Sequence, residues 1–282
     1  MVATHLPAYF VVTYLITWGF FFAGSLTPAA WPRGLLFLLG TFAPGYVALW
    51  FTSRETGRGG VAALLRRLVE WRVPARWYAF AAGYIVVIKL TVALVHRAVT
   101  GAWPLFGRLP WYLMLAATVG STVVGGQSGE EVGWRGYALP RLAARFGLGG
   151  GSVLLGLLWA CWHLPLFFIP GVDTAGQSFP LYLLQVTALS VAMAWLFAHT
   201  RGTLLPVMLM HAAVNNTKDI VPSAEPNSTN AWTLSHSLVA WMTLVLLWLC
   251  AGYFLLRMRK NSMLERDVVA DGPAAGRNGC GT

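Results

Sequence analysis

Eight apolar runs constrain this chain more than any other feature of its sequence. They lie at about residues 8–26, 34–52, 77–95, 112–139, 151–169, 180–198, 203–218 and 232–256. A helix that crosses the hydrocarbon of a bilayer needs about 20 predominantly apolar residues, and each run approaches or exceeds that length. The sequence therefore predicts an all-α polytopic membrane protein, built as a bundle of about eight transmembrane helices.

The composition supports this prediction, because charged residues are scarce. Only 11% of the 282 residues are charged and 57% are apolar, whereas a soluble globular domain carries about 25% charged residues. An ordinary soluble enzyme and a disordered protein are both excluded. We expect a single transmembrane domain over residues 1–256, followed by a cytoplasmic tail over 257–282 that is rich in Gly and Ala and disordered.

The net charge of +10 has two readings, nucleic-acid binding or membrane topology. When loops are assigned alternately to the two sides, 15 of the 20 Lys and Arg residues fall on one side, in loops at 53–76, 129–149 and 200–203 and in the tail from 257. By the positive-inside rule that side is cytoplasmic, and so are both termini. The charge predicts a multi-pass protein of a cell membrane, with the lipid bilayer rather than nucleic acid as its partner. The preference for Arg over Lys favours a bacterial inner membrane.

Ionisable residues inside a membrane are costly and indicate function by default. The first such segment, residues 129–136, holds Glu130 and Glu131, whose side chains project about 100° apart on a helix and so take different partners. Glu131 and Arg135 are spaced i, i+4 with the acid first, which favours an ion pair. Glu130 is left without a local cation and is available as a general base. The alternative is a salt bridge of the inner loop with no chemistry. Pro140 is expected to end this helix.

Two further apolar runs contain histidines. His163 lies about 12 residues into its run, and its alternative role is a hydrogen-bonded packing residue. His211 and Asn215 are spaced i, i+4 on one helix face, a pair suited to stabilising an oxyanion or, alternatively, to holding two helices together. Counted from the inner ends of their spans, Glu130 and His211 lie about 13 and 12 Å deep at 1.5 Å per residue. We therefore expect one catalytic cavity in the inner half of the bilayer, open toward the cytoplasm.

This set of side chains has two chemical readings, both of which lead to amide hydrolysis. In the first, Glu130 removes a proton from water with help from His163, while His211 and Asn215 hold the oxyanion. In the second, Glu130, His163 and His211 bind zinc, which activates the bound water. The sequence has no HExxH motif, so the usual arrangement of zinc ligands on one helix is absent.

The three segments resemble the three signatures of the CPBP family: EExxxR at Glu130, Glu131 and Arg135, a motif that ends at His163, and HxxxN at His211 and Asn215. That family comprises type II CAAX prenyl endopeptidases and bacterial Abi proteins linked to bacteriocin processing or immunity. The resemblance covers about residues 125–220 and implies a protease core at about 111–220. One residue departs from the pattern, because the second motif usually begins with Phe and here begins with Trp159.

The resemblance implies an intramembrane endopeptidase that hydrolyses membrane-tethered peptides or prenylated proteins, with CAAX-type processing as one candidate activity. It implies Glu130 as the water-activating base, assisted by His163, an oxyanion site at His211 and Asn215, and support from Glu131 and Arg135. No cofactor is expected, with zinc as the alternative. Two other functions remain open: a proton-coupled transporter, since membrane Glu and His also form proton relays, and a catalytically inactive immunity protein.

Overall fold

The computed structural model describes residues 5–172, 174, 177–222, 230–234, 237–260 and 268, and these residues form helices without a β-strand. The predicted all-α polytopic bundle is confirmed. The predicted tail lies outside the described residues, apart from its first four residues, which end the last helix, and Val268. In chain order the elements are α1 (Leu6–Leu26), α2 (Ala30–Val69), α3 (Ala75–Thr100), α4 (Trp111–Val124), α5 (Gly126–Glu131), a π-helix (Val132–Ala138), α6 (Leu139–Trp162), a 3-10 helix (Leu164–Phe168), α7 (Phe179–His199), α8 (Leu205–Thr217), a 3-10 helix (Lys218–Ile220) and α9 (Leu238–Lys260).

Within the described part of the chain, six helical segments are long and apolar enough to cross a membrane, which supports a multi-pass membrane protein. They are Leu6–Leu26, Ala30–Val69, Ala75–Thr100, Gly126–Phe168, Phe179–His199 and Leu238–Lys260. The remaining predicted runs correspond to shorter helices: α4 has 14 residues and α8 has 13. The run at 112–139 does not form one helix, because Gly125 is extended (φ −80°, ψ 167°) and separates α4 from α5.

The helix that carries the two adjacent carboxylates ends later than predicted. The expectation that Pro140 stops it is wrong, because the chain stays helical through Pro140, which lies in the first turn of α6 where a missing N–H is tolerated. The break comes instead at Gly147, whose φ of 72° is in the left-handed region. A Cβ on Gly151 would lie 2.9 Å from the backbone nitrogen of Ala143, so the chain folds back at Gly147.

Glycines let α2 approach α5 and the π-helix at backbone contact. A Cβ on Gly129 would lie 2.6 Å from Phe42 Cδ1, and a Cβ on Gly133 would lie 2.5 Å from Pro44 Cβ, so neither position accepts a larger side chain without a shift. Small residues of this kind permit close packing of transmembrane helices. The contact fixes the rotation of the helical turn between them, which is the turn that carries Glu130 and Glu131.

The second half of α2 turns back at Gly57, where φ is 68°. The segment that follows this turn is helical as far as Val69. Its buried face is anchored by Leu64, whose Cδ1 lies 2.6 Å from the position of a Cβ on Gly136. The backbone carbonyl of Arg67 accepts a hydrogen bond of 2.9 Å from the N–H of Leu204. This segment therefore packs against both the π-helix and the start of α8.

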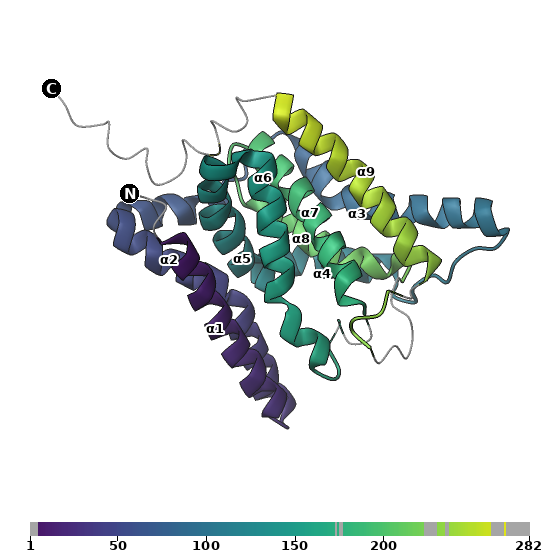
Figure 1. Cartoon of the computed structure of the whole chain (residues 1–282), viewed down its shortest axis with the longest axis horizontal. Helices are drawn as coiled ribbons and strands as arrows, with labels where there is room; N and C mark the ends of the chain where they lie inside the picture. The colour runs from purple at the N-terminus through teal and green to yellow at the C-terminus, as the bar shows by residue number, and fades with distance from the viewer. Residues whose placement is uncertain are drawn as a thin grey trace.

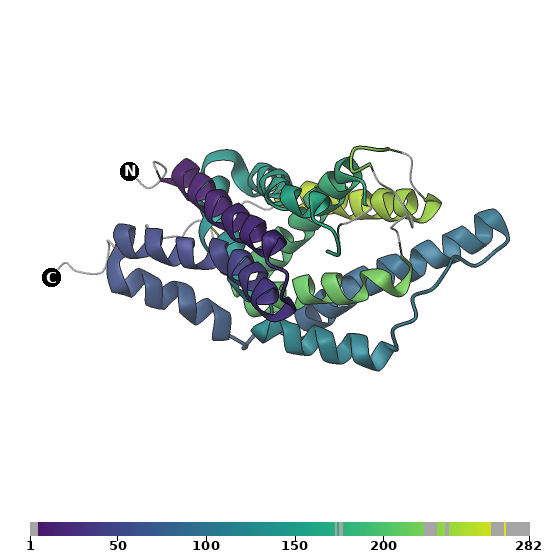
Figure 2. The same cartoon turned by 90° about the horizontal axis from the view of Figure 1, so that it is seen from below.

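The bundle has a central helix and a more exposed shell. In the most apolar stretch of α7, 72% of the residues are buried, whereas the corresponding share in α1 is 22%. Figure 1 shows α6, α7 and α8 at the centre, the α1–α2 pair along one edge and α3 with α9 toward the other. Figure 2 shows the same layers from below, with α2 folded back on itself. Large apolar side chains are exposed along the outer helices, as lipid contact requires, among them Val11, Leu15, Val87, Leu94, Val119, Val123, Val245 and Leu249.

Candidate active site

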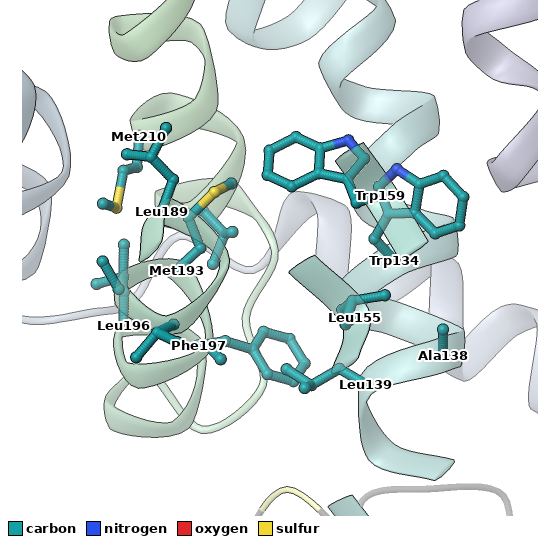
Figure 3. Packing of buried hydrophobic residues seen from close by; sticks show 14 of the residues in the cluster. Trp134, Ala138, Leu139, Leu155, Trp159, Leu189, Met193, Leu196, Phe197 and Met210 are labelled. Carbon is teal, nitrogen blue, oxygen red and sulfur yellow. The ribbon is translucent and has the colours of Figure 1, made fainter. Parts of the chain in front are cut away.

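Glu130 is buried on α5 and its carboxylate is held by two indoles. Its Oε2 accepts a hydrogen bond of 2.8 Å from Trp159 Nε1 on α6 and a longer one of 3.4 Å from Trp134 Nε1 on the π-helix. Figure 3 shows the two indole rings together, with their ring nitrogens near each other. Both donors are neutral, so the carboxylate is oriented by hydrogen bonds and makes no ion pair with a described cation.

Glu131 lies at the centre of a separate network. Its Oε1 accepts 2.9 Å from Arg135 Nη1 and 2.8 Å from His211 Nδ1, and all three side chains are buried. The predicted Glu131–Arg135 ion pair is therefore present. An ionised carboxylate only accepts hydrogen bonds, so Nδ1 is the protonated nitrogen that His211 directs at Glu131. The contact fixes the orientation of the imidazole, and Nε2 is the nitrogen that remains for chemistry.

The two neighbouring carboxylates divide their partners as the helical geometry predicts. Glu130 contacts indoles, while Glu131 contacts a guanidinium and an imidazole. Arg135 is further enclosed, because its Nη2 lies 3.3 Å from Met193 Sδ on α7 and its Cζ lies 4.4 Å from the centre of the Trp159 ring. The arginine is thus fixed between α6 and α7 with its charge directed at Glu131.

His163 joins this group through Trp159. Its Nδ1 donates 2.8 Å to the carbonyl oxygen of Trp159, which leaves Nε2 as the unprotonated nitrogen of the neutral ring. His163 lies within the apolar helical segment Gly126–Phe168, where it is the C-cap of α6 and precedes the 3-10 helix that contains Pro165. The Trp159 ring lies between the two imidazoles, with its centre 5.9 Å from that of His163 and 5.1 Å from that of His211.

Asn215 lies one turn beyond His211 on α8, and its side chain is exposed. The structure does not bring it into the buried hydrogen-bond network, although it shares a helix with His211. The neighbouring Asn216 has a different position, because its Nδ2 donates 2.9 Å to Ser121 Oγ on α4 and 2.8 Å to the carbonyl of Ala212. Asn216 therefore connects α8 to α4, and Asn215 is the amide left at the surface.

The alternative zinc ligands do not gather into a metal site. Among the described residues, no group of three His, Cys, Asp or Glu side chains has an arrangement able to hold a metal ion. Trp159 and Glu131 engage one atom each of Glu130 and His211, and Glu130 Oε1 and His211 Nε2 lie outside these two contacts. The side chains of the described residues therefore do not assemble a three-ligand zinc site.

The sequence did not identify several contacts of this site. The sequence indicates no role for Trp134, and it marks Trp159 only as the residue that begins the second motif. Trp134 is spaced i, i+4 from Glu130, a pattern that places both on one helix face. The contact of Trp159 and the pairing of His211 with Glu131 join residues that are 29 and 80 positions apart, so spacing alone carries no signal for them.

Together, the fold and the site define a polytopic helical membrane protein with a cluster of two carboxylates, an arginine and two histidines, all buried except His163, which is partly exposed. A sequence model of the Rce1-like family, type II CAAX prenyl endopeptidases, matches residues 107–217, which include every predicted site residue. The chain is also 22% identical over 236 residues to CAAX prenyl protease 2 of Methanococcus maripaludis, a match that covers 76% of this chain and 83% of that relative.

These comparisons confirm the resemblance to the CPBP family proteases that the three motifs indicate. They support intramembrane endopeptidase activity and, with the apolar helices, membrane-associated protein substrates.

Proposed function

We propose that this protein is a glutamate-dependent intramembrane endopeptidase that cleaves membrane-associated proteins from the cytoplasmic side. The observation that carries the proposal is the buried carboxylate of Glu130. Its Oε2 is engaged by two neutral indole donors, whereas the adjacent Glu131 takes up the nearby positive charge of Arg135. A carboxylate with one oxygen held and the other unengaged by a cation is suited to accept a proton from water.

In the proposed reaction, Glu130 takes a proton from a water molecule as the water oxygen attacks the carbonyl carbon of the scissile peptide bond. The resulting tetrahedral intermediate carries its negative charge on the former carbonyl oxygen. When it collapses, the C–N bond breaks and the leaving amine takes the proton back from Glu130. His163 assists by accepting a hydrogen bond from the attacking water at Nε2, since its Nδ1 donates to the Trp159 carbonyl.

The oxyanion is proposed to lie between His211 Nε2 and the side-chain amide of Asn215. A charged His211 ring donates from Nε2, and Glu131 at Nδ1 supplies the countercharge for the imidazolium. Asn215 is exposed one turn farther along α8 and is available to a substrate rather than committed to the protein interior. The two donors come from one helix, so substrate binding along α8 would align both.

The reaction is proposed to need no metal, because the described residues include no group of three His, Cys, Asp or Glu side chains arranged to hold a metal ion. Both termini and the basic loops are proposed to be cytoplasmic, in a bacterial inner membrane. An assay in liposomes with a strong chelator tests whether the reaction needs a metal. Activity that disappears on chelation and returns with zinc alone would contradict it.

The central test replaces Glu130 by Gln and measures cleavage of a membrane-tethered peptide in proteoliposomes. We expect kcat to fall by about 10³-fold, because a general base contributes about 10²–10⁴-fold. The matched control is Glu55→Gln, which makes the same chemical change in a carboxylate outside the site. Wild-type turnover in the Glu130 variant would contradict the proposal, and so would a wild-type protein that cleaves no membrane-tethered substrate.

A CAAX-type substrate is the first candidate, because the curated relative carries the name of a CAAX prenyl protease. The chain is expected to cleave a farnesylated peptide that ends in a CAAX sequence and to release the terminal tripeptide. A matched peptide without the prenyl group tests whether the lipid is recognised. Equal cleavage of both peptides would show that the prenyl group is not recognised.

A further inference from the structure

We propose that Trp159 is a positioning residue for Glu130, and that its indole N–H, rather than the bulk of its ring, sets the orientation of the general base. This inference rests on the proposed function, because it assigns a role to a residue that acts through Glu130.

The geometry separates Trp159 from the other indole at the carboxylate. Its Nε1 lies 2.8 Å from Glu130 Oε2, a normal hydrogen-bond length, while Trp134 Nε1 lies at 3.4 Å from the same oxygen. Trp159 comes from α6, on the far side of the break at Gly147. It thus connects the base to a second helical segment, whereas Trp134 is four residues from Glu130 on the same continuous stretch.

Trp159 is itself held by the other polar residues of the site. The Arg135 guanidinium lies 4.4 Å from the centre of its ring, and the ring of His211 meets it edge-on at 5.1 Å. Its backbone carbonyl accepts the hydrogen bond from His163 Nδ1. One residue therefore contacts Glu130, Arg135, His163 and His211, and it is 4% exposed. A ring fixed on so many sides holds its N–H in one direction.

This arrangement determines which oxygen of Glu130 does the chemistry. With Oε2 held by the indole, Oε1 is the oxygen left to accept a proton from water, and rotation of the carboxylate is restricted. A hydrogen bond to a charged acceptor is among the stronger ones in proteins, and it loses value steeply when its geometry changes. Loss of the N–H is expected to lower the fraction of time that Glu130 points correctly, and hence kcat, without changing how the substrate binds.

Two substitutions at residue 159 separate the N–H from the ring. Trp159→Phe keeps an aromatic wall and removes the donor, and we expect kcat to fall about tenfold with KM within about twofold of wild type. Replacement of Trp159 by benzothienylalanine keeps the size and shape of the indole and puts sulfur in place of N–H, so it leaves no cavity. We expect the same loss of kcat. Wild-type kcat in the benzothienylalanine protein would overturn the proposal and assign the effect of Phe to packing.

The matched control is Trp195→Phe on α7. It makes the same change of side chain at an indole whose buried Nε1 has no hydrogen-bond partner among the described residues. We expect kcat within about twofold of wild type for this variant, because no hydrogen bond is lost. A tenfold loss here as well would show that Trp-to-Phe changes lower kcat through packing in general, and would contradict the role of the N–H.

A readout that does not need turnover separates this proposal from the proposed function. In protein labelled with ¹⁵N-indole, the Trp159 signal is identified by its disappearance in Trp159→Phe. We expect that signal to move on Glu130→Ala, because its acceptor is removed, and to stay in place on Glu55→Ala. A Trp159 signal that stays in place in Glu130→Ala would overturn the positioning role. A responsive signal in a wild-type protein that cleaves nothing would instead contradict the peptidase and leave the hydrogen bond supported.

Discussion

Two carboxylate–arginine clusters lie along the π-helix and place the same pair of charges in different surroundings. In the site cluster, Glu131 accepts hydrogen bonds from Arg135 and His211 on the single oxygen Oε1. In the second cluster, Glu55 on α2 accepts 2.7 Å from the Tyr137 hydroxyl on Oε1 and pairs with Arg141 on Oε2. Arg141 also donates 2.8 Å to the carbonyl of Tyr137.

Only one of the two clusters has a side-chain atom available for catalysis. In the Glu55 cluster, both carboxylate oxygens and the Tyr137 hydroxyl make contacts within the cluster. These contacts join α2 to the π-helix and α6. In the Glu131 cluster, His211 contacts Glu131 through Nδ1, and its Nε2 makes none of the contacts of the cluster. Buried ion pairs are weak evidence of net stabilisation, but removing one partner is strongly destabilising. We therefore expect both clusters to matter for stability and the Glu131 cluster alone to matter for turnover.

The largest expected loss of stability follows from Glu131→Ala. This change leaves the Arg135 guanidinium buried without its counterion, which costs about 3–5 kcal/mol of stability. It also frees His211, and loss of a partner that orients an active imidazole lowers activity about 10–100-fold. Thermal unfolding in detergent and peptide cleavage per folded molecule measure the two losses. A variant that is destabilised but retains full specific activity would break the distinction between the clusters.

Asn215→Ala tests whether the site extends beyond the buried cluster. The side chain is exposed, so its removal is expected to leave the thermal midpoint unchanged within error. If the amide holds the oxyanion, kcat falls by about 10²–10³-fold, the usual cost of one such donor. Asn216→Ala is the matched control on α8: it breaks a bond to Ser121 and is expected to affect stability more than kcat. The reverse pattern would move the functional amide to Asn216.

How much of this arrangement the sequence predicts depends on whether the contacts are local. The helical class follows from the apolar runs, and the Glu131–Arg135 pair follows from i, i+4 spacing, since both are properties of one continuous segment. The break at Gly125 was not predicted, because the apolar composition continues through it. The two clusters could not be told apart, because Glu55 joins Tyr137 and Arg141 across 82 and 86 residues. Such pairings depend on how α2 packs against glycines of α5 and the π-helix.

Glu55→Gln tests whether the second cluster contributes to stability without affecting turnover. It removes the charge that faces Arg141 and is expected to cost about 3 kcal/mol, at the lower end for a buried pair because Glu55 is 10% exposed. Cleavage per folded molecule is expected to stay within about twofold of wild type. The measurements are a denaturation curve in detergent and kcat on the same samples. A tenfold fall in kcat would mean that this cluster also sets the geometry of the site through the π-helix.

The smallest expected effect belongs to Tyr137→Phe, which removes one hydroxyl and leaves the ring in place. The ring still lies 3.5 Å from the Arg141 guanidinium and packs against Tyr9, so only the hydrogen bond to Glu55 is lost. We expect a loss of about 1 kcal/mol, because Glu55 keeps its pair with Arg141. Tyr137 is only two residues after Arg135, so an unchanged kcat would show that neighbouring positions of one π-helix serve separate purposes. A lower kcat at this small cost in stability would show instead that the two clusters act as one.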